Sequence, residues 1–398
     1  MWWPSGLFGN RVAELAEVLA VDLDDSKGIP RLNTDWRWED QEQALLIACS
    51  SLISIVKDGH SRVVQFSHFS VKEFLTSSRL SAACGEVSAY RIDLENAHTI
   101  LAQACLGALL QTHDKIVGYM SKDHPLARYA AEHWTSHAQF GEVSSRLQKG
   151  MGYLFNPDKP HFRVWLTLYD IDTVPDEGAT FFYFTPYRKS AATPLYYAAL
   201  CGFHDLVEHL IAKYPQDVNA NGGYYMRPLI AALAGEHFQI ADLLRHNGAD
   251  PHVQGLPKVF PLHSAAFVEK FEVVKKLIEY DADIDARDEY GCTPLYYASR
   301  GRHLKDGSVL RLLLEHGADI NARADEDTPD STPLHRASKN GALEVVRLLL
   351  EHGADVEAVN ADGKTALQVV GKTTYTDSKV DQVRCDEIRR LLVEHGVK

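Results

Sequence analysis

Several features that would indicate other kinds of protein are absent from this sequence. Its six cysteines are scattered over 398 residues without a C-x-x-C pair, which argues against a disulfide framework and a cysteine zinc site. Acidic residues outnumber basic ones, 54 to 41, and the net charge of −13 disfavours binding to nucleic acid or an anionic membrane. No apolar run reaches the roughly 18 residues of a bilayer span, and the first residues do not resemble a secretory signal. We therefore expect a cytoplasmic protein that binds neither nucleic acid nor membranes.

Motifs of enzymes and of bound cofactors are also absent. There is no G-x-x-x-x-G-K-[ST] loop to hold phosphates and no G-x-S-x-G turn to present a nucleophile. Residues 18–25 superficially resemble a magnesium-binding strand, but without a phosphate loop we interpret them as a helix end and a solvated turn. His133 and His137 lie one helical turn apart, as in half of a zinc site. Trp134 stands where a metalloprotease has glutamate, so we interpret the histidines as a surface pair. We expect no enzyme activity, no cofactor and no metal.

A short phrase returns six times in the second half of the chain, the last time in degraded form. It reads T-P-L-Y-Y-A-A at Thr193 and T-P-L-H-R-A-S at Thr332, and variants begin at residues 227, 260, 293 and 365. A period of about 33 residues resembles the ankyrin repeat, a turn followed by two short helices. Because one unit cannot bury its apolar face alone, such repeats stack into a solenoid.

The fifth repeat shows why the pattern predicts two helices. Thr332 is suited to cap the first helix, Pro333 to begin it and Gly341 to end it. Apolar residues over 345–349 then recur at helical spacing, and Gly353 ends the second helix. Both helices are too short to be stable alone, so we expect stacking to stabilise them. Near the ends of the second helices lie His246, His316, His352 and His395, each of which we expect to bond the backbone or to complement the helix dipole.

Residues 1–190 lack this period. Helical patterns over 12–20, 36–48 and 69–80 around a hairpin over 52–66 indicate a small winged-helix-like module, and further helices are expected over 95–110, 127–140, 143–147 and 162–170. We expect a mainly α fold in three parts: the winged-helix-like module at 1–91, a helical linker at 92–192 and an ankyrin-repeat solenoid at 193–398. The six repeats would span 193–226, 227–259, 260–292, 293–331, 332–364 and 365–398.

Part of the first half resembles a known family. The strings R-V-V-Q-F-S-H-F-S-V-K-E-F-L-T-S (62–77), A-H-T-I-L-A-Q-A-C-L-G (97–107) and L-A-R-Y-A-A-E-H-W (126–134) are similar to fungal NACHT–ankyrin proteins, which are NLR-like STAND NTPases. The resemblance implies the winged helix, helical linker and ankyrin sensor of a signalling NTPase, without its NTPase domain. Because acidic residues outnumber basic ones in the module, a regulatory winged helix is favoured over a DNA-binding one.

Two functional hypotheses follow from the sequence. In the first, the solenoid is a non-enzymatic module that recognises a protein partner with its concave face and loop tips, in NLR-like signalling or self/non-self sensing. In the second, the chain is the regulatory or sensor fragment of a NACHT NTPase assembly, with the NTPase domain supplied in trans or lost by truncation. The candidate partner-binding residues are Tyr225, Tyr290 and Asp362 at loop tips and Leu200, Phe267, Arg300 and Lys339 on the concave side.

Overall fold

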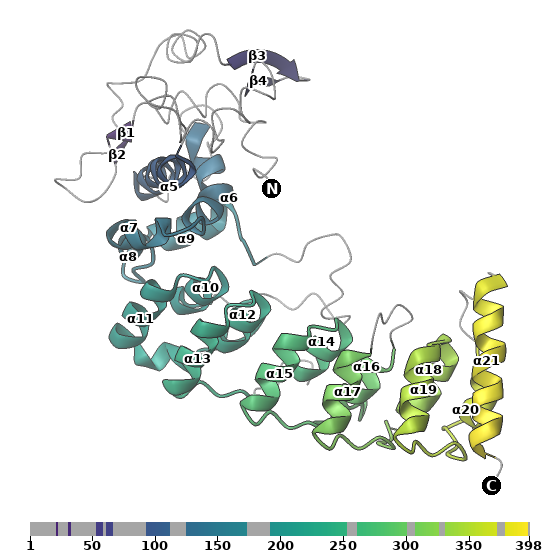
Figure 1. Ribbon diagram of the computed structural model, residues 1–398. Helices are drawn as coiled ribbons and strands as arrows, with labels where there is room; N and C mark the ends of the chain where they lie inside the picture. The colour runs from purple at the N-terminus through teal and green to yellow at the C-terminus, as the bar shows by residue number, and fades with distance from the viewer. Residues whose placement is uncertain are drawn as a thin grey trace, which may run out of the picture. The chain divides into compact units, whose positions relative to one another are not determined.

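The computed structural model is mainly helical over the residues that it describes, as predicted (Figure 1). These are residues 93–111, 125–172, 192–252, 261–300, 307–325, 331–371 and 379–396, together with four short strands before residue 67. Contacts divide the chain into two compact units: residues 1–173 with 192–217, and residues 174–191 with 218–398. The first repeat therefore groups with the helices that precede it, while the predicted division into three parts stays a prediction. No helix of the described segments has the length and apolar composition needed to cross a membrane.

The strands form two antiparallel pairs. β3 (Ile53–Asp58) pairs with β4 (Ser61–Phe66) in the predicted hairpin. β1 (Val21–Asp22) pairs with β2 (Arg31–Leu32), so Asp22 lies in a strand and not in the expected turn after a helix. The helices predicted over 12–20, 36–48 and 69–80 lie outside the described residues, and the winged helix remains a prediction.

The first unit contains the linker helices and the first helix pair of the repeats. Two fully buried tryptophans, Trp134 and Trp165, pack edge to face with ring centroids 5.2 Å apart. Phe203, at the start of the second helix of the first repeat, lies 5.3 Å from Trp134 and 6.4 Å from Phe155. The first repeat thus shares one aromatic core with the linker. The helices are α5 (Leu94–Gln111), α6 (Pro125–Ala138), α7 (Val143–Arg146), α8 (Gln148–Leu154), α9 (His161–Leu168), α10 (Pro194–Leu200) and α11 (His204–Lys213), of which α8 was not predicted.

Hydrogen bonds reinforce this junction. The hydroxyl of Tyr196 donates to Asp172 Oδ1 at 2.9 Å, and that of Tyr197 donates to Asp170 Oδ1 at 3.3 Å. Both aspartates follow α9, and both tyrosines lie in α10. Because Asp172 and Tyr196 are buried, these polar groups need each other as partners.

In the described residues of the second unit, five helix pairs follow one another along the chain. In Figure 1, the first helices α12, α14, α16 and α18 form one row and the second helices α13, α15, α17 and α19 form another. Each first helix begins one residue after the start of the recurring phrase. After the 3₁₀ helix η5 (Pro215–Asn219), the pairs are α12 (Pro228–Ala234) with α13 (Phe238–His246), α14 (Pro261–Phe267) with α15 (Phe271–Glu279), α16 (Pro294–Ala298) with α17 (Ser308–Glu315), α18 (Pro333–Asn340) with α19 (Leu343–Glu351), and α20 (Ala366–Val369) with α21 (Lys379–Gly396).

The expected capping residues are in place in α18. Thr332 Oγ1 accepts a hydrogen bond from the backbone N–H of His335, Pro333 is the first helical residue, and Gly341 ends the helix at φ +70°. At the ends of the second helices, each of the four predicted histidines bonds the carbonyl four residues earlier through Nδ1: His246, His316, His352 and His395. The sequence therefore predicts the local structure of the repeats correctly.

Candidate functional site

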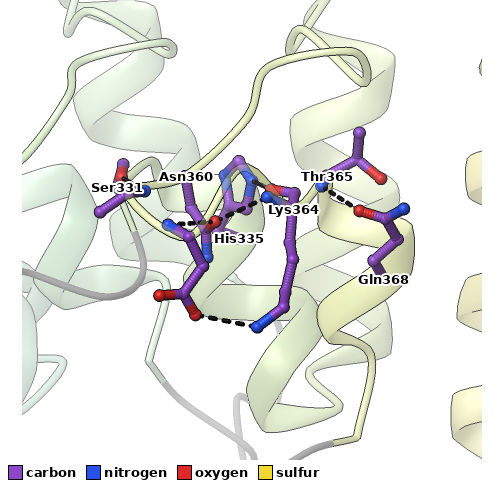
Figure 2. A network of polar contacts seen from close by, with 8 residues as sticks. Ser331, His335, Asn360, Lys364, Thr365 and Gln368 are labelled. Carbon is purple, nitrogen blue, oxygen red and sulfur yellow. Dashed lines mark hydrogen bonds and ion pairs between the residues drawn. The ribbon is translucent and has the colours of Figure 1, made fainter.

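Buried side chains hold the loop tips that precede the first helices. Asp288 Oδ1 accepts hydrogen bonds from the backbone N–H groups of Tyr290 and Cys292, at 2.9 and 2.8 Å. Asn360 Oδ1 does the same for Asp362 and Lys364, at 3.0 and 2.9 Å (Figure 2). These bonds close the turns, so the side chains at both tips are presented by a fixed backbone.

The tips are also hydrogen-bonded to residues in or just before the preceding first helix. His335 Nε2 donates to the carbonyl oxygen of Lys364 at 2.9 Å, and Ser331 Oγ accepts from the backbone N–H of Ala361 at 3.1 Å (Figure 2). His263 makes the equivalent bond to the carbonyl of Cys292 at 3.0 Å. Burial lowers the pKa of His263, so its ring is neutral and donates with one nitrogen only. A substitution that moves the backbone of one tip would therefore also alter a hydrogen bond to the preceding helix pair.

Two of the predicted contact residues lie side by side on the row of first helices. Phe267 ends α14 and Arg300 follows α16, and the guanidinium carbon of Arg300 lies 5.0 Å from the centre of the Phe267 ring. This is within the range of a cation–π interaction. Lys339 has the equivalent position in the next first helix, α18. All three side chains are half-buried.

The other predicted residues are more separate. Tyr290 is 37% exposed at its tip, and Asp362 is exposed and pairs with Lys364 Nζ at 3.0 Å. Tyr225 is half-buried and packs edge to face with Tyr224, with ring centroids 5.1 Å apart. Leu200 ends α10 in the first unit, so it does not share a unit with the rest.

Sequence reasoning missed two residues of the same face, Tyr297 and Arg336. The Tyr297 ring lies 6.3 Å from that of Phe267, and its hydroxyl donates to Asp288 Oδ2 at 2.6 Å. Burial and the Asp288 carboxylate raise the pKa of Tyr297, which keeps the hydroxyl protonated as a donor. Arg336 lies over the Tyr296 ring at 5.5 Å. Spacing could have identified both residues, because each precedes a predicted residue by three and so shares its helix face.

His133 and His137, which we interpreted as a surface pair, do not form one, because His137 is buried. His137 is 1% exposed, because it lies on the side of α6 that packs against α5. Its Nδ1 lies 2.9 Å from Nδ1 of His98, and its Nε2 lies 2.8 Å from the Tyr129 hydroxyl oxygen. Burial, followed by the nearby His98, lowers the pKa of His137 to about 3. Among the residues with described positions, no group of three or more His, Cys, Asp or Glu side chains is arranged to hold a metal ion.

Comparison with known proteins agrees with the repeat structure. Sequence models of ankyrin repeats match residues 192–220, 229–324 and 313–370. The azaphilone pigments biosynthesis cluster protein L of Monascus ruber is 30% identical over 253 residues, which cover 60% of this chain and 52% of the relative. Alpha-latrocrustotoxin-Lt1a of Latrodectus tredecimguttatus is 35% identical over 104 residues, 25% of this chain and 7% of the toxin. Potassium channel AKT2/3 of Arabidopsis thaliana is 32% identical over 112 residues, 27% of this chain and 13% of the channel.

The match to the Monascus ruber protein extends beyond the repeats. It covers a larger share of this chain than residues 192–398 alone, so it reaches into the segment before the first repeat. The chain spans about half the length of that relative and much smaller shares of the toxin and the channel. The similarity to the toxin and the channel is short enough to lie within the repeats.

Proposed function

We propose, on the premise that residues 192–370 are ankyrin repeats, that the row of first helices and the loop tips of the second unit hold a protein partner. The ankyrin repeats indicate a protein-interaction module, and the proposal names the surface of the repeats that binds the partner. Stacked repeats present a continuous row of side chains that no single helix pair could provide.

The stack of Arg300 on Phe267 is the observation that carries the proposal. Aromatic and arginine side chains are enriched among the residues that contribute most to protein interfaces. Stacking fixes the orientation of the guanidinium before a partner arrives, so less side-chain entropy is lost on binding. The Tyr290 tip adds an aromatic ring, 37% exposed, on a hydrogen-bonded turn.

The test is capture of partners by the immobilised full chain from an extract of its own source cells. We expect the Tyr290→Ala/Arg300→Ala variant to lose proteins that the unchanged chain retains, at an unchanged melting temperature. The matched control is Lys275→Ala/Glu315→Ala, a pair of exposed residues on the second helices α15 and α17. Equal capture by all three proteins would show that this surface is not the binding surface.

The role of such binding is proposed from the resemblance to fungal NACHT–ankyrin proteins. In this view the chain acts in NLR-like signalling or self/non-self sensing, and the repeats sense the partner. The β3–β4 hairpin is consistent with a winged helix, because such a module contains one. The alternative remains that the chain is the regulatory or sensor fragment of a NACHT NTPase assembly.

Genomic sequence separates the two roles. An in-frame phosphate loop encoded upstream of Met1 would support the fragment of an NTPase. In the absence of such a loop, a NACHT domain supplied in trans should co-purify with the full chain and not with a chain that lacks residues 1–91. Failure of both observations would contradict the NACHT alternative and leave the binding function untouched.

A further inference from the structure

We propose that the exposed face of α21 binds the same face of a second copy of this chain, with the two helices antiparallel. This face consists of four exposed residues at helical spacing, Val383, Asp386, Arg390 and Val393, and is called the outer face of α21 below. It is separate from the row of first helices, so the proposed function neither requires nor excludes this contact.

The opposite side of α21 packs on the preceding helices. Cys385, Ile388 and Leu392 are buried, and the helix contacts α19 and α20 (Figure 1). Successive residues of an α-helix are rotated by about 100°, which places the four residues of the outer face across the helix from these three. The outer face of α21 therefore lies on the side away from α19 and α20.

Two apolar side chains on this face are open to solvent. Val383 is 67% exposed and Val393 is 49% exposed, the largest exposed fractions of any large apolar side chain among the described residues. Removing such side chains from water favours association with another surface.

The charges on the same face identify a second copy as the occupant. In a two-fold contact between antiparallel helices, residues equally far before and after the midpoint face each other. With the midpoint at the level of Ile388, Val383 faces Val393 of the second copy, and Asp386 faces Arg390 of the second copy. The register that brings the valines together therefore also brings opposite charges together, and each contact occurs twice.

The spacing along the helix also favours a pair of helices. Positions 383, 386, 390 and 393 alternate steps of three and four residues, as the seam of a coiled coil does. A parallel pair would place Asp386 against Asp386 and Arg390 against Arg390, and these like charges would repel each other. The charges therefore select the antiparallel orientation.

The charges that flank this seam near its midpoint, Glu387 and Arg389, have ion-pair partners within their own copy. Glu387 Oε1 lies 3.2 Å from Arg347 Nη2 in α19, and Arg389 Nη1 lies 2.7 Å from Asp386 Oδ1. These pairs reduce the repulsion between like flank charges across the two-fold axis. The second carboxylate oxygen of Asp386, Oδ2, can accept a hydrogen bond from Arg390 of the second copy.

The proposed contact is small and the dimer should be weak. α21 has 18 residues, which give a helix about 27 Å long. The net charge of −13 opposes the approach of two copies. Because interfaces below the standard size belong to weak and reversible complexes, we expect the dimer to form only at high protein concentration.

The first test is analytical ultracentrifugation of the full chain from about 5 to about 500 µM, the range of weak complexes. We expect the average mass to rise with concentration toward that of a dimer. Val383→Lys/Val393→Lys should weaken the association at least tenfold at an unchanged melting temperature, because it places charges where the valines meet.

Exchange of the charges tests the register. Asp386→Arg and Arg390→Asp should each weaken the dimer at least fivefold, because each variant brings like charges face to face. An equimolar mixture of the two variants, and the double variant Asp386→Arg/Arg390→Asp, should both restore the affinity to within about threefold, because opposite charges meet again. The matched control is Arg311→Asp/Glu315→Arg, an exchange of two exposed charges four residues apart on α17, which should leave the association unchanged.

Three results would overturn the proposal. A chain that stays monomeric over the whole range would do so, even if Val383→Lys/Val393→Lys then loses a protein from the cell extract, because the face would bind that protein and not a second copy. A dimer that persists in Val383→Lys/Val393→Lys would show that another surface joins the copies. A dimer weakened by the single charge reversals but restored neither by their mixture nor by the double variant would contradict the antiparallel register.

The dimer and the proposed function fail independently. Tyr290→Ala/Arg300→Ala, which should lose partners from the cell extract, should dimerise like the unchanged chain. A dimer that requires Tyr290 and Arg300 would place the contact between copies on the row of first helices and overturn the assignment to α21.

Discussion

At the scale of single residues, the loop tips depend on a few polar side chains and on close backbone contact between neighbouring repeats. Arg287 Nη1 donates to the carbonyl oxygen of Arg323, and Arg323 Nη2 donates to that of Val359, both at 2.7 Å. The backbone N–H of Asp325 donates to the carbonyl of Tyr290 at 2.9 Å. These contacts join residues 35 or more positions apart, which is why sequence spacing predicts the repeats but not the links between their tips.

Replacing Gly291 by alanine should destabilise the second unit. Gly291 has φ +68°, and an added Cβ would lie 2.9 Å from the backbone nitrogen of Asp325 and nearer still to its carboxylate. The positive φ alone costs about 1–2 kcal/mol, and we expect the steric clash to raise the total loss to about 3 kcal/mol. The measurement is the free energy of unfolding in urea.

Gly353→Ala is the matched control for that substitution. Gly353 also has a positive φ, +85°, but no atom lies within 4 Å of its added Cβ. It should lose only the cost of the positive φ, about 1–2 kcal/mol. Equal losses for the two variants would contradict the close contact between the tips of neighbouring repeats.

The buried His98–His137 pair predicts a loss of stability in acid. Burial lowers the pKa of His137 to about 3, against about 6.5 in the unfolded chain. Between these values the unfolded chain binds a proton that the folded chain does not, so the free energy of unfolding falls as the pH falls. The slope for this group reaches about 1.4 kcal/mol per pH unit.

Thermal unfolding between pH 7.5 and pH 4.5 checks this prediction. We expect the melting temperature of the first unit to fall over this range, and His137→Gln, which does not titrate, to reduce the dependence on pH. His352→Gln is the control, since His352 lies exposed at the end of α19, where its Nδ1 donates to the carbonyl of Leu348. An unchanged pH dependence in His137→Gln would contradict the assignment.

At the scale of helices, most of the repeat structure could be predicted and most of its packing could not. The T-P-L phrase, a glycine stop and a 3.6-residue apolar period are local signals, so α18 and α19 match the expectation closely. α8 was missed because its apolar residues, Met151 and Leu154, are few and lie between glycines and polar residues. The aromatic core of the first unit joins Trp134 to Phe203, and no local pattern relates residues 69 positions apart.

Two phenylalanine substitutions compare the core of the first unit with the proposed binding surface. Phe203 is 1% exposed between Trp134 and Phe155, so Phe203→Ala should lower the free energy of unfolding by about 3–5 kcal/mol. Phe267 is half-buried, so Phe267→Ala should cost about 1 kcal/mol and weaken partner binding. Urea unfolding and the capture of partners from the cell extract measure the two effects, and a larger loss of stability in Phe267→Ala would contradict the assignment of their roles.

At the scale of the whole chain, the first repeat has the sequence of an ankyrin repeat but packs with the helices that precede the repeats. By sequence it is an ankyrin repeat, matched over residues 192–220. By contacts it is grouped with the linker helices, through Phe203 in the aromatic core and through the bonds of Tyr196 and Tyr197 to Asp172 and Asp170. The similarity to the Monascus ruber protein, which extends before residue 192, also covers part of this combined unit. The period of the repeats predicted a boundary at residue 193, but a period carries no information about what the first unit packs against.

A chain that begins at Thr193 should therefore fail to fold its first repeat. The cut removes Trp134 and Trp165, which cover Phe203 and Tyr197, and it removes the acceptors of both tyrosine hydroxyls. We expect the amides of α10 and α11 to exchange with solvent at least a hundredfold faster in the 193–398 fragment than in the full chain, while those of α18 and α19 keep their protection. Hydrogen exchange read by mass spectrometry measures both pairs in one experiment. Equal protection of α10 and α11 in the two proteins would show that the first repeat is stable without the linker, and the aromatic core would then join two structures that fold independently.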